Sequence, residues 1–187
     1  MAHVQVPEGE PGIIGLMLAF QESREPLNAL CNVVMCGESS SLSKAEREMI
    51  ATYVSSGNEC YFCTNSHAAA ARQLLGDKAP LMDAVLVDLD TCGVDDKMRA
   101  LLTIAGKVRR DGRTVTPDDV ARARAAGADD RAIHDTVLIA AMFCMFNRYV
   151  DGLGTWAPRN PEVYAEIGNR ISTKGYGSRY READKRK

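Results

Sequence analysis

The chain has 187 residues, 45% apolar and only 6% aromatic, which is enough for one globular domain with an ordinary core. Its 23 basic and 25 acidic residues leave a net charge of −2. This balance excludes a chain-wide positive field of the kind that attracts nucleic acids and anionic membranes. No apolar run approaches the ~20 residues that span a bilayer, and the N-terminal sequence lacks the pattern of a secretory signal. We therefore expect a cytoplasmic protein that binds neither nucleic acid nor membrane.

Helical periodicity runs through the chain, and alternating strand patterns with hairpin turns are missing. The helical segments, bounded by capping residues or glycines, cover 12–37, 41–57, 60–76, 95–112, 116–127 and 129–154. The first should be interrupted near Pro26, because proline lacks a backbone donor. The second begins with Ser43 and Glu46, which have the spacing of a capping box. The sequence predicts an all-α helical bundle.

Residues 156–187 differ in composition from the helices before them. They contain prolines, several glycines and a basic end in which acidic residues are interspersed. We expect residues 1–155 to form a single all-α domain. Residues 156–187 should form a C-terminal extension that lies on the surface or wraps a neighbouring subunit.

The cysteines indicate reduced thiols rather than a disulfide framework. The chain holds six of them, but it is long, lacks a secretory signal and has enough apolar residues to fold unaided. Cys31, Cys36 and Cys144 stand in apolar helical segments, where cysteine is typically a small buried hydrophobe. Cys92 stands in a predicted loop and is compatible with a structural or a reactive role.

Two cysteines and a histidine share one face of the helix predicted over 60–76. Cys60, Cys63 and His67 fall within about 60° of one another on a helical wheel. Cys63 and His67 are an i, i+4 pair with Cβ atoms ~5–6 Å apart, which suits proton transfer from thiol to imidazole. Because the cysteines stand in the first turn, we expect the helix dipole to lower the pKa of a thiol there.

The residues alone leave three interpretations of this face open. A redox-active dithiol is one, since the Cβ atoms of Cys60 and Cys63 can come within disulfide reach, although the helix predicted before them disfavours a thioredoxin-like fold. A zinc site is another, but it would need a fourth ligand, and the candidates are Cys92, His134 and carboxylates. A pair of inert buried thiols is the third.

The stretch EMIATYVSSGNECYFCTNSH resembles the signature of the alkylhydroperoxidase D-like proteins of the carboxymuconolactone decarboxylase superfamily. That signature is a glutamate, eleven residues, Cys-x-x-Cys, three residues and a histidine, and Glu48 stands at the required position. The segments LSKAEREMIA, VTPDDVARARAAG and FNRYVDGLG are similar as well, so the resemblance covers about residues 12–155. Within the superfamily the chain resembles the peroxidase-related subgroup.

The resemblance implies an all-helical homo-oligomer with a thiol peroxidase site. Cys63 would attack the peroxide, Cys60 would resolve the product as a disulfide, and Glu48 and His67 would relay protons. The implied partners are a peroxide substrate and an external dithiol of lipoyl or thioredoxin type, and no bound cofactor or metal is required. The alternatives are an acid/base enzyme like carboxymuconolactone decarboxylase, and a non-enzymatic zinc-binding or redox-sensing module.

Helical periodicity alone would leave Glu48 in water, because the apolar stripe of segment 41–57 lies elsewhere and includes Glu46. Small residues surround Glu48 on the wheel: Ala45, Ala51, Thr52 and Ser55. A face of small residues can admit a neighbouring helix, so we expect the cysteine helix to pack there and Glu48 to reach the thiols. For His134 we expect a structural role, and for Asn147 packing or a subunit contact.

Overall fold

The computed structural model describes residues 2–180, and in this range it contains helices and turns but no β-strand, so the all-α prediction is confirmed. The α-helices are α1 (Gly12–Ala19), α2 (Gln21–Cys31), α3 (Lys44–Gly57), α4 (Tyr61–Leu75), α5 (Pro80–Val87), α6 (Asp96–Asp111), α7 (Pro117–Ala125), α8 (Asp130–Gly152) and α9 (Pro161–Lys174). A π-helical turn, η1 (Asn32–Cys36), continues α2. Short 3-10 turns, η2 (Gly76–Lys78) and η3 (Gly112–Thr114), follow α4 and α6.

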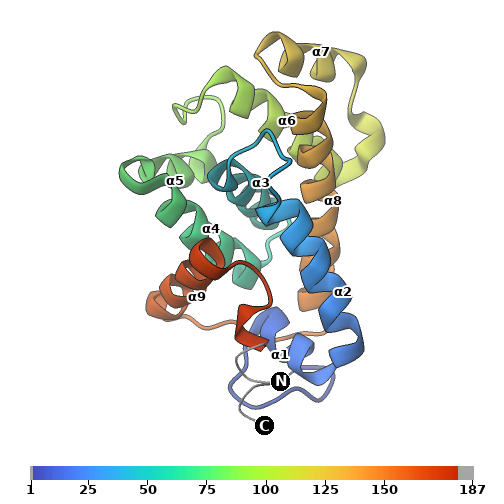
Figure 1. Cartoon of the computed structure of the whole chain (residues 1–187), viewed down its shortest axis with the longest axis vertical. Coiled ribbons are helices and arrows are strands. Elements are labelled where there is room, and N and C mark those ends of the chain that lie inside the picture. Colours follow the sequence, from blue (N-terminus) through green and yellow to red (C-terminus); the bar gives the residue numbers. More distant parts are fainter. Residues whose placement is uncertain (1, 181–187) are drawn as a thin grey trace.

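Helix α3 lies inside the bundle and organises it. It packs against α4, α6 and α8, while α9 packs on α4 (Figure 1). Ile50, Ala51 and Val54 of α3 are wholly buried between these neighbours. Burial of apolar surface stabilises a fold by ~25 cal/mol per Å². Moving α3 away from α4 would expose these side chains, so the packing holds the two helices in place.

The helix ends follow the capping signals of the sequence. Ser43 and Glu46 form the predicted capping box of α3, with distances of 3.2 Å from Glu46 N to Ser43 Oγ and 2.7 Å from Ser43 N to Glu46 Oε2. Thr116 and Asp119 form a second box at the start of α7. Gly76 ends α4 in the left-handed region, with φ of 57°. Local sequence therefore sets the bounds of α3, α4 and α7.

The prediction of a helix break at Pro26 is wrong. The interruption lies at Phe20, which has a non-helical backbone (φ −116°, ψ 77°), and Pro26 stands inside α2. The missing N–H of Pro26 would have paired with the carbonyl of Glu22, and both residues are exposed. Water can therefore satisfy that carbonyl, and the helix continues past the proline.

Two helices were not among the predicted segments. Helix α5 begins with Pro80 and ends at Val87. Helix α9 lies in the predicted C-terminal extension, where Asn160 caps it by accepting a 3.0 Å bond from Glu162 N. Residues 161–174 are thus an ordered helix on α4. The boundary at residue 155 and the contact with a neighbouring subunit stay predictions, and residues 181–187 of the extension lie outside the described residues.

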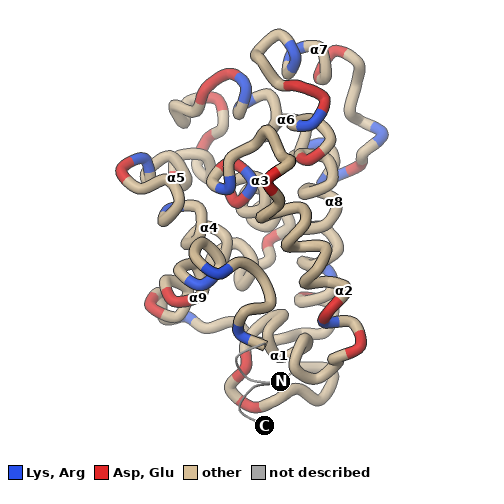
Figure 2. The backbone as a smooth tube through the Cα atoms, viewed as in Figure 1, with Lys and Arg blue, Asp and Glu red and all other residues tan. Residues whose placement is uncertain are grey.

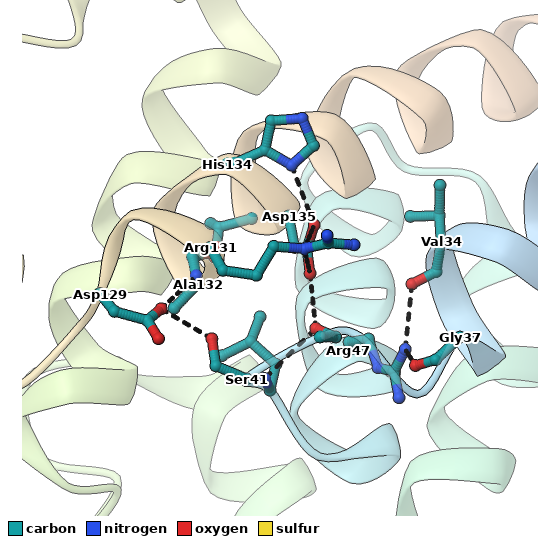
Figure 3. Close-up of polar contacts among 12 residues, drawn as sticks. Val34, Gly37, Ser41, Arg47, Asp129, Arg131, Ala132, His134 and Asp135 are labelled. Carbon is teal, nitrogen blue, oxygen red and sulfur yellow. Dashed lines mark hydrogen bonds and ion pairs between the residues drawn. The ribbon is translucent and has the colours of Figure 1, made fainter.

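Polar contacts fasten the segment between η1 and α3 (Figure 3). Ser41 Oγ donates to Asp129 Oδ1 at 2.7 Å, and this joins the segment to the start of α8. Arg47, buried on α3, donates to the carbonyls of Val34 (3.2 Å) and Gly37 (2.9 Å), which the end of η1 leaves free. These bonds hold η1 against α3 immediately beside Glu48.

Acidic and basic residues are interspersed along the described chain, and neither sign is confined to one part of the fold (Figure 2). This distribution agrees with the near-neutral composition. Among residues 2–180, no helix combines the length and apolar character that crossing a membrane requires.

Candidate active site

Helices α3 and α4 bring a glutamate and a histidine together inside the protein. Glu48 Oε2 lies 2.7 Å from His67 Nδ1, and the two residues are 2% and 7% exposed. The approach is close because Ala51, Thr52 and Ser55, the small residues of α3, are fully buried at this contact face. Glu48 is therefore inside the bundle, as its small neighbours indicated.

Glu46 occupies a different environment. It is half-buried, completes the capping box of α3 and pairs with Lys97 Nζ at 2.7 Å. Hydrogen bonds from Lys97 and Ser43 outweigh partial burial and lower the pKa of the Glu46 carboxyl. Although Glu46 falls in the apolar stripe of the helical wheel, its side chain forms an ion pair near the surface and is not part of the site.

Tyr176, which follows α9, contacts both Glu48 and His67. Its hydroxyl donates a 2.7 Å hydrogen bond to Glu48 Oε1 and lies 3.4 Å from His67 Nδ1. The Tyr176 ring stacks on the imidazole, with a centroid distance of 6.1 Å and an interplanar angle of 19°. Burial and the charge of Glu48 raise the pKa of Tyr176 well above its usual value, so the hydroxyl stays a donor.

The backbone around Tyr176 is held by an asparagine of the π-helical turn. Asn32 Nδ2 donates to the Tyr176 carbonyl at 3.1 Å, and the Tyr176 amide donates to Asn32 Oδ1 at 3.0 Å. Gly175 allows the turn out of α9 with φ of 66°. Helix α9 itself lies tightly on α4, because a Cβ on Gly168 would be 2.7 Å from the Ala69 carbonyl carbon. These contacts position the tyrosine, and no local sequence pattern indicated them.

The two cysteines lie at the start of α4 as neighbouring free thiols. Cys60 precedes the helix as its N-cap, Cys63 is in the first turn, and they are 0% and 4% exposed. The hydrogen bond with Cys60, burial and the charge of Cys60 raise the pKa of Cys63 well above its usual value. The pKa of Cys63 is therefore raised, where its place in the first turn predicts a lowering by the helix dipole, and Cys63 is protonated at rest.

Helix α8 supplies two further polar groups beside the thiols. Asn147 is 1% exposed, donates to Ser55 Oγ at 3.1 Å and accepts from Asn58 Nδ2 at 2.9 Å. A hydrogen bond from Asn147 to Cys63 lowers the pKa of that thiol and opposes the other effects. Burial raises the pKa of Asp151, while a hydrogen bond with Cys60 lowers it. Asn147, for which packing or a subunit contact is predicted, is thus buried in the bundle and also contacts the Cys63 thiol.

A cavity of about 110 Å³ lies beside these groups, with Cys63 and His67 in its wall. Phe143 lies edge-on to the imidazole, with a centroid distance of 4.5 Å. The rest of the wall is mostly apolar and comes from α1, α4, α8 and α9, with Ile14, Met17, Phe62, Phe146, Ile167 and Ile171. Residues 175–180 also line it. The thiol and the imidazole therefore face a small apolar space.

Two of the suggested fourth zinc ligands, Cys92 and His134, are engaged elsewhere. The thiol of Cys92 donates to the carbonyl of Leu89 at 3.2 Å, and His134 Nδ1 lies 2.9 Å from Asp135 Oδ1 at the start of α8 (Figure 3). Within the described part of the chain, no three His, Cys, Asp or Glu side chains gather as a metal would require. Cys92 and His134 therefore lie outside the site, which consists of a Glu48–His67 pair and a Cys60–Cys63 pair, with Cys63 and His67 in the wall of the same cavity.

Comparisons with known proteins agree with this arrangement. The model of the carboxymuconolactone decarboxylase family matches residues 21–106. An uncharacterised peroxidase-related protein from Silicibacter sp. TM1040 is 32% identical, with a TM-score of 0.71 over 81% of this chain and 78% of that chain. A peroxidase-related protein with an alkylhydroperoxidase AhpD core, from Ralstonia eutropha JMP134, is 26% identical, with a TM-score of 0.74 over 84% and 80% of the two chains.

A protein of unknown function from Agrobacterium tumefaciens shares the fold at 23% identity, with a TM-score of 0.68 over 80% of this chain and 99% of that chain. A search of curated proteins gives no match. The similarity to these solved structures extends over most of the bundle, well beyond the helices that carry the cysteines.

Proposed function

This chain belongs to the alkylhydroperoxidase D-like proteins of the carboxymuconolactone decarboxylase superfamily, and we propose that it is a thiol-dependent peroxidase. The proposal rests above all on the cavity wall, where Cys63 and His67 lie one helical turn apart and Glu48 binds His67 at 2.7 Å. Relatives described as peroxidase-related support it.

In the first step the sulfur of Cys63, as thiolate, attacks one peroxide oxygen. An S–O bond forms as the O–O bond breaks, the peroxide takes up two electrons, and the leaving oxygen is protonated to an alcohol or water. In the second step the sulfur of Cys60 attacks the sulfenic acid of Cys63. The S–S bond forms and water leaves, so the pair ends as a disulfide.

The buried polar groups provide the proton transfers. Because the raised pKa keeps Cys63 protonated at rest, its attack needs a base, and the imidazole of His67 is the base within one turn. With Glu48 ionised, Nδ1 of His67 carries a proton toward the carboxylate and leaves Nε2 as the basic nitrogen. Glu48 stabilises the imidazolium, and Tyr176 holds Glu48 by its second oxygen.

An external dithiol of the lipoyl or thioredoxin type restores the reduced pair by thiol–disulfide exchange. Both cysteines are buried, so the exchange requires the reductant to approach the start of α4, or that part of the chain to move. We also propose that the protein acts in the cytoplasm as a homo-oligomer, as the family resemblance implies.

Peroxide consumption in the presence of dithiothreitol tests the proposal. Wild-type protein and Cys92→Ser should consume tert-butyl hydroperoxide at equal rates, because Cys92 lies away from the site. Cys63→Ser should abolish the reaction, and Cys60→Ser should allow one oxidation of Cys63 without rapid turnover. Full activity of Cys63→Ser would refute Cys63 as the nucleophile. Absence of peroxide consumption by the wild type would favour the acid/base alternative, which uses His67 and Glu48 without the thiols.

A further inference from the structure

Helix α8 places two polar side chains beside the start of α4. Asn147 and Asp151 are four residues apart on α8 and therefore lie on the same face of it. Asn147 donates to Ser55 Oγ at 3.1 Å and accepts from Asn58 Nδ2 at 2.9 Å. These bonds hold the face against the end of α3 and the chain just before α4, and Asp151 extends it by one turn.

The carboxylate of Asp151 is hydrogen-bonded to the thiol of Cys60. This bond lowers the pKa of Asp151 against the effect of burial, so it favours the ionised carboxylate, and the thiol is the donor. Cys60 is also the hydrogen-bond partner of Cys63. The three groups thus form a chain of contacts from Cys63 in the cavity wall, through Cys60, to Asp151.

Asp151 is the end of this chain that reaches water. Cys60 and Cys63 are 0% and 4% exposed, whereas Asp151 is an exposed residue. No lysine or arginine among residues 2–180 forms an ion pair with the Asp151 carboxylate. The carboxylate is therefore placed to take a proton from a buried thiol and to release it to solvent.

We propose that Asp151 is a catalytic residue, the base that takes the proton of Cys60 when this thiol attacks the sulfenic acid of Cys63. The inference rests on the proposed function and gives its second step a base. As the proton moves to Asp151, the sulfur of Cys60 forms the S–S bond and the S–O bond at Cys63 breaks. The leaving hydroxide takes up one proton and departs as water. Asp151 releases the proton that it received to solvent, so the step needs no further oxidant or reductant.

Asp151→Asn should change the two steps of the reaction differently. Besides Cys60 and burial, the charge of Asp151 raises the pKa of Cys63, so its removal should leave the oxidation of Cys63 as fast as before or faster. Loss of the base should slow closure of the disulfide by ~10²-fold, the lower end of general acid–base effects. Rapid quenching after one equivalent of tert-butyl hydroperoxide, followed by mass spectrometry, measures both steps. The sulfenic acid of Cys63 should accumulate in the variant.

Two further variants control for charge and for folding. Asp151→Glu keeps a carboxylate and should restore most of the closure rate. Glu59→Gln removes an exposed carboxylate next to Cys60 in the sequence and should close the disulfide as wild type does. Closure at the wild-type rate in Asp151→Asn would overturn the proposal. Equal slowing of both steps in Asp151→Asn, or equal slowing of closure in Glu59→Gln, would overturn it as well.

A reaction without peroxide separates this inference from the proposed function. The aromatic disulfide dithiodipyridine forms a mixed disulfide with Cys63, and attack by Cys60 then releases thiopyridone as the protein disulfide closes. Slower closure in Asp151→Asn, in a protein that consumes no peroxide, would refute the peroxidase and leave Asp151 as the base of Cys60. Peroxide turnover with the same closure rate in wild type and Asp151→Asn would refute the role of Asp151 alone.

Discussion

The hydroxyl of Tyr176 donates a 2.7 Å hydrogen bond to Glu48 Oε1 across 128 positions of the sequence. The same carboxylate binds His67 Nδ1 through its other oxygen. The tyrosine comes from the segment after α9, and its backbone is held by Asn32. The C-terminal region is thus part of the polar centre of the protein, and the proposed proton relay should depend on it.

Tyr176→Phe should slow peroxide reduction by ~10- to 150-fold at neutral pH, because a hydrogen bond to a charged group contributes ~1.5–3 kcal/mol. The loss leaves the Glu48 carboxylate without the hydrogen bond to its Oε1. Steady-state rates between pH 5 and pH 9 would measure the effect. Tyr53→Phe, on α3 but outside the relay, is the control; an unchanged profile in Tyr176→Phe would remove Tyr176 from the mechanism.

The two glutamates of α3 should behave differently. Glu48→Gln removes the charge beside His67 and should slow the reaction by ~10²–10⁴-fold, the range of general acid–base effects. Glu46→Gln weakens the capping box and the Lys97 ion pair, so it should cost only ~0.5–1 kcal/mol of unfolding free energy and leave the rate intact. Urea denaturation measures the stability of both variants, and peroxide assays measure their rates. A slow Glu46→Gln variant together with a Glu48→Gln variant of normal rate would place Glu46 in the relay.

The reactivity of Cys63 should rise with pH. Its pKa is raised, so the thiolate fraction near pH 7 lies below that of an ordinary thiol and grows as pH rises through the raised value. Because Cys60 is the largest cause of the shift, Cys60→Ala should displace the curve to lower pH. Rates of iodoacetamide labelling at Cys63, followed by mass spectrometry, measure the curve. A displacement to higher pH in Cys60→Ala contradicts the assigned cause.

Gly168→Ala should loosen the contact between α9 and α4. The new Cβ would lie 2.7 Å from the Ala69 carbonyl carbon, so α9 must shift. Overpacking of this kind costs ~1–3 kcal/mol, and it should also reduce activity because Tyr176 follows the same helix. Thermal unfolding and peroxide assays check the two effects. Unchanged activity in a destabilised variant would show that Tyr176 reaches Glu48 independently of α9.

Local signals predicted much of the fold. The capping box of Ser43 and Glu46, the stop at Gly76 and the cap at Thr116 act within a few residues, so the sequence displays them. The break at Phe20 and the helix α9 were missed. At Pro26 solvent exposure decided the outcome, and exposure depends on the tertiary fold. Asn160, Pro161 and Gly175 did mark α9, yet the composition of the tail obscured them.

The candidate site was only partly visible in the sequence. The spacing of Cys60, Cys63 and His67 along one helix predicted that they share a face. The family resemblance added Glu48, although helical periodicity alone predicted that its side chain is exposed to solvent. Tyr176 could not be predicted, because it reaches the site through tertiary contacts with distant segments. The raised pKa of Cys63 likewise reflects the neighbouring thiol and burial, whereas the sequence predicts a lowering by the helix dipole.

The most direct test is a single-turnover reaction of fully reduced protein with a limiting amount of tert-butyl hydroperoxide, followed by peptide mapping under non-reducing conditions. We predict one Cys60–Cys63 disulfide for each peroxide consumed, with the thiols of Cys31, Cys36, Cys92 and Cys144 unchanged. Consumption of peroxide without that disulfide, or with oxidation at another cysteine, would contradict the proposed mechanism.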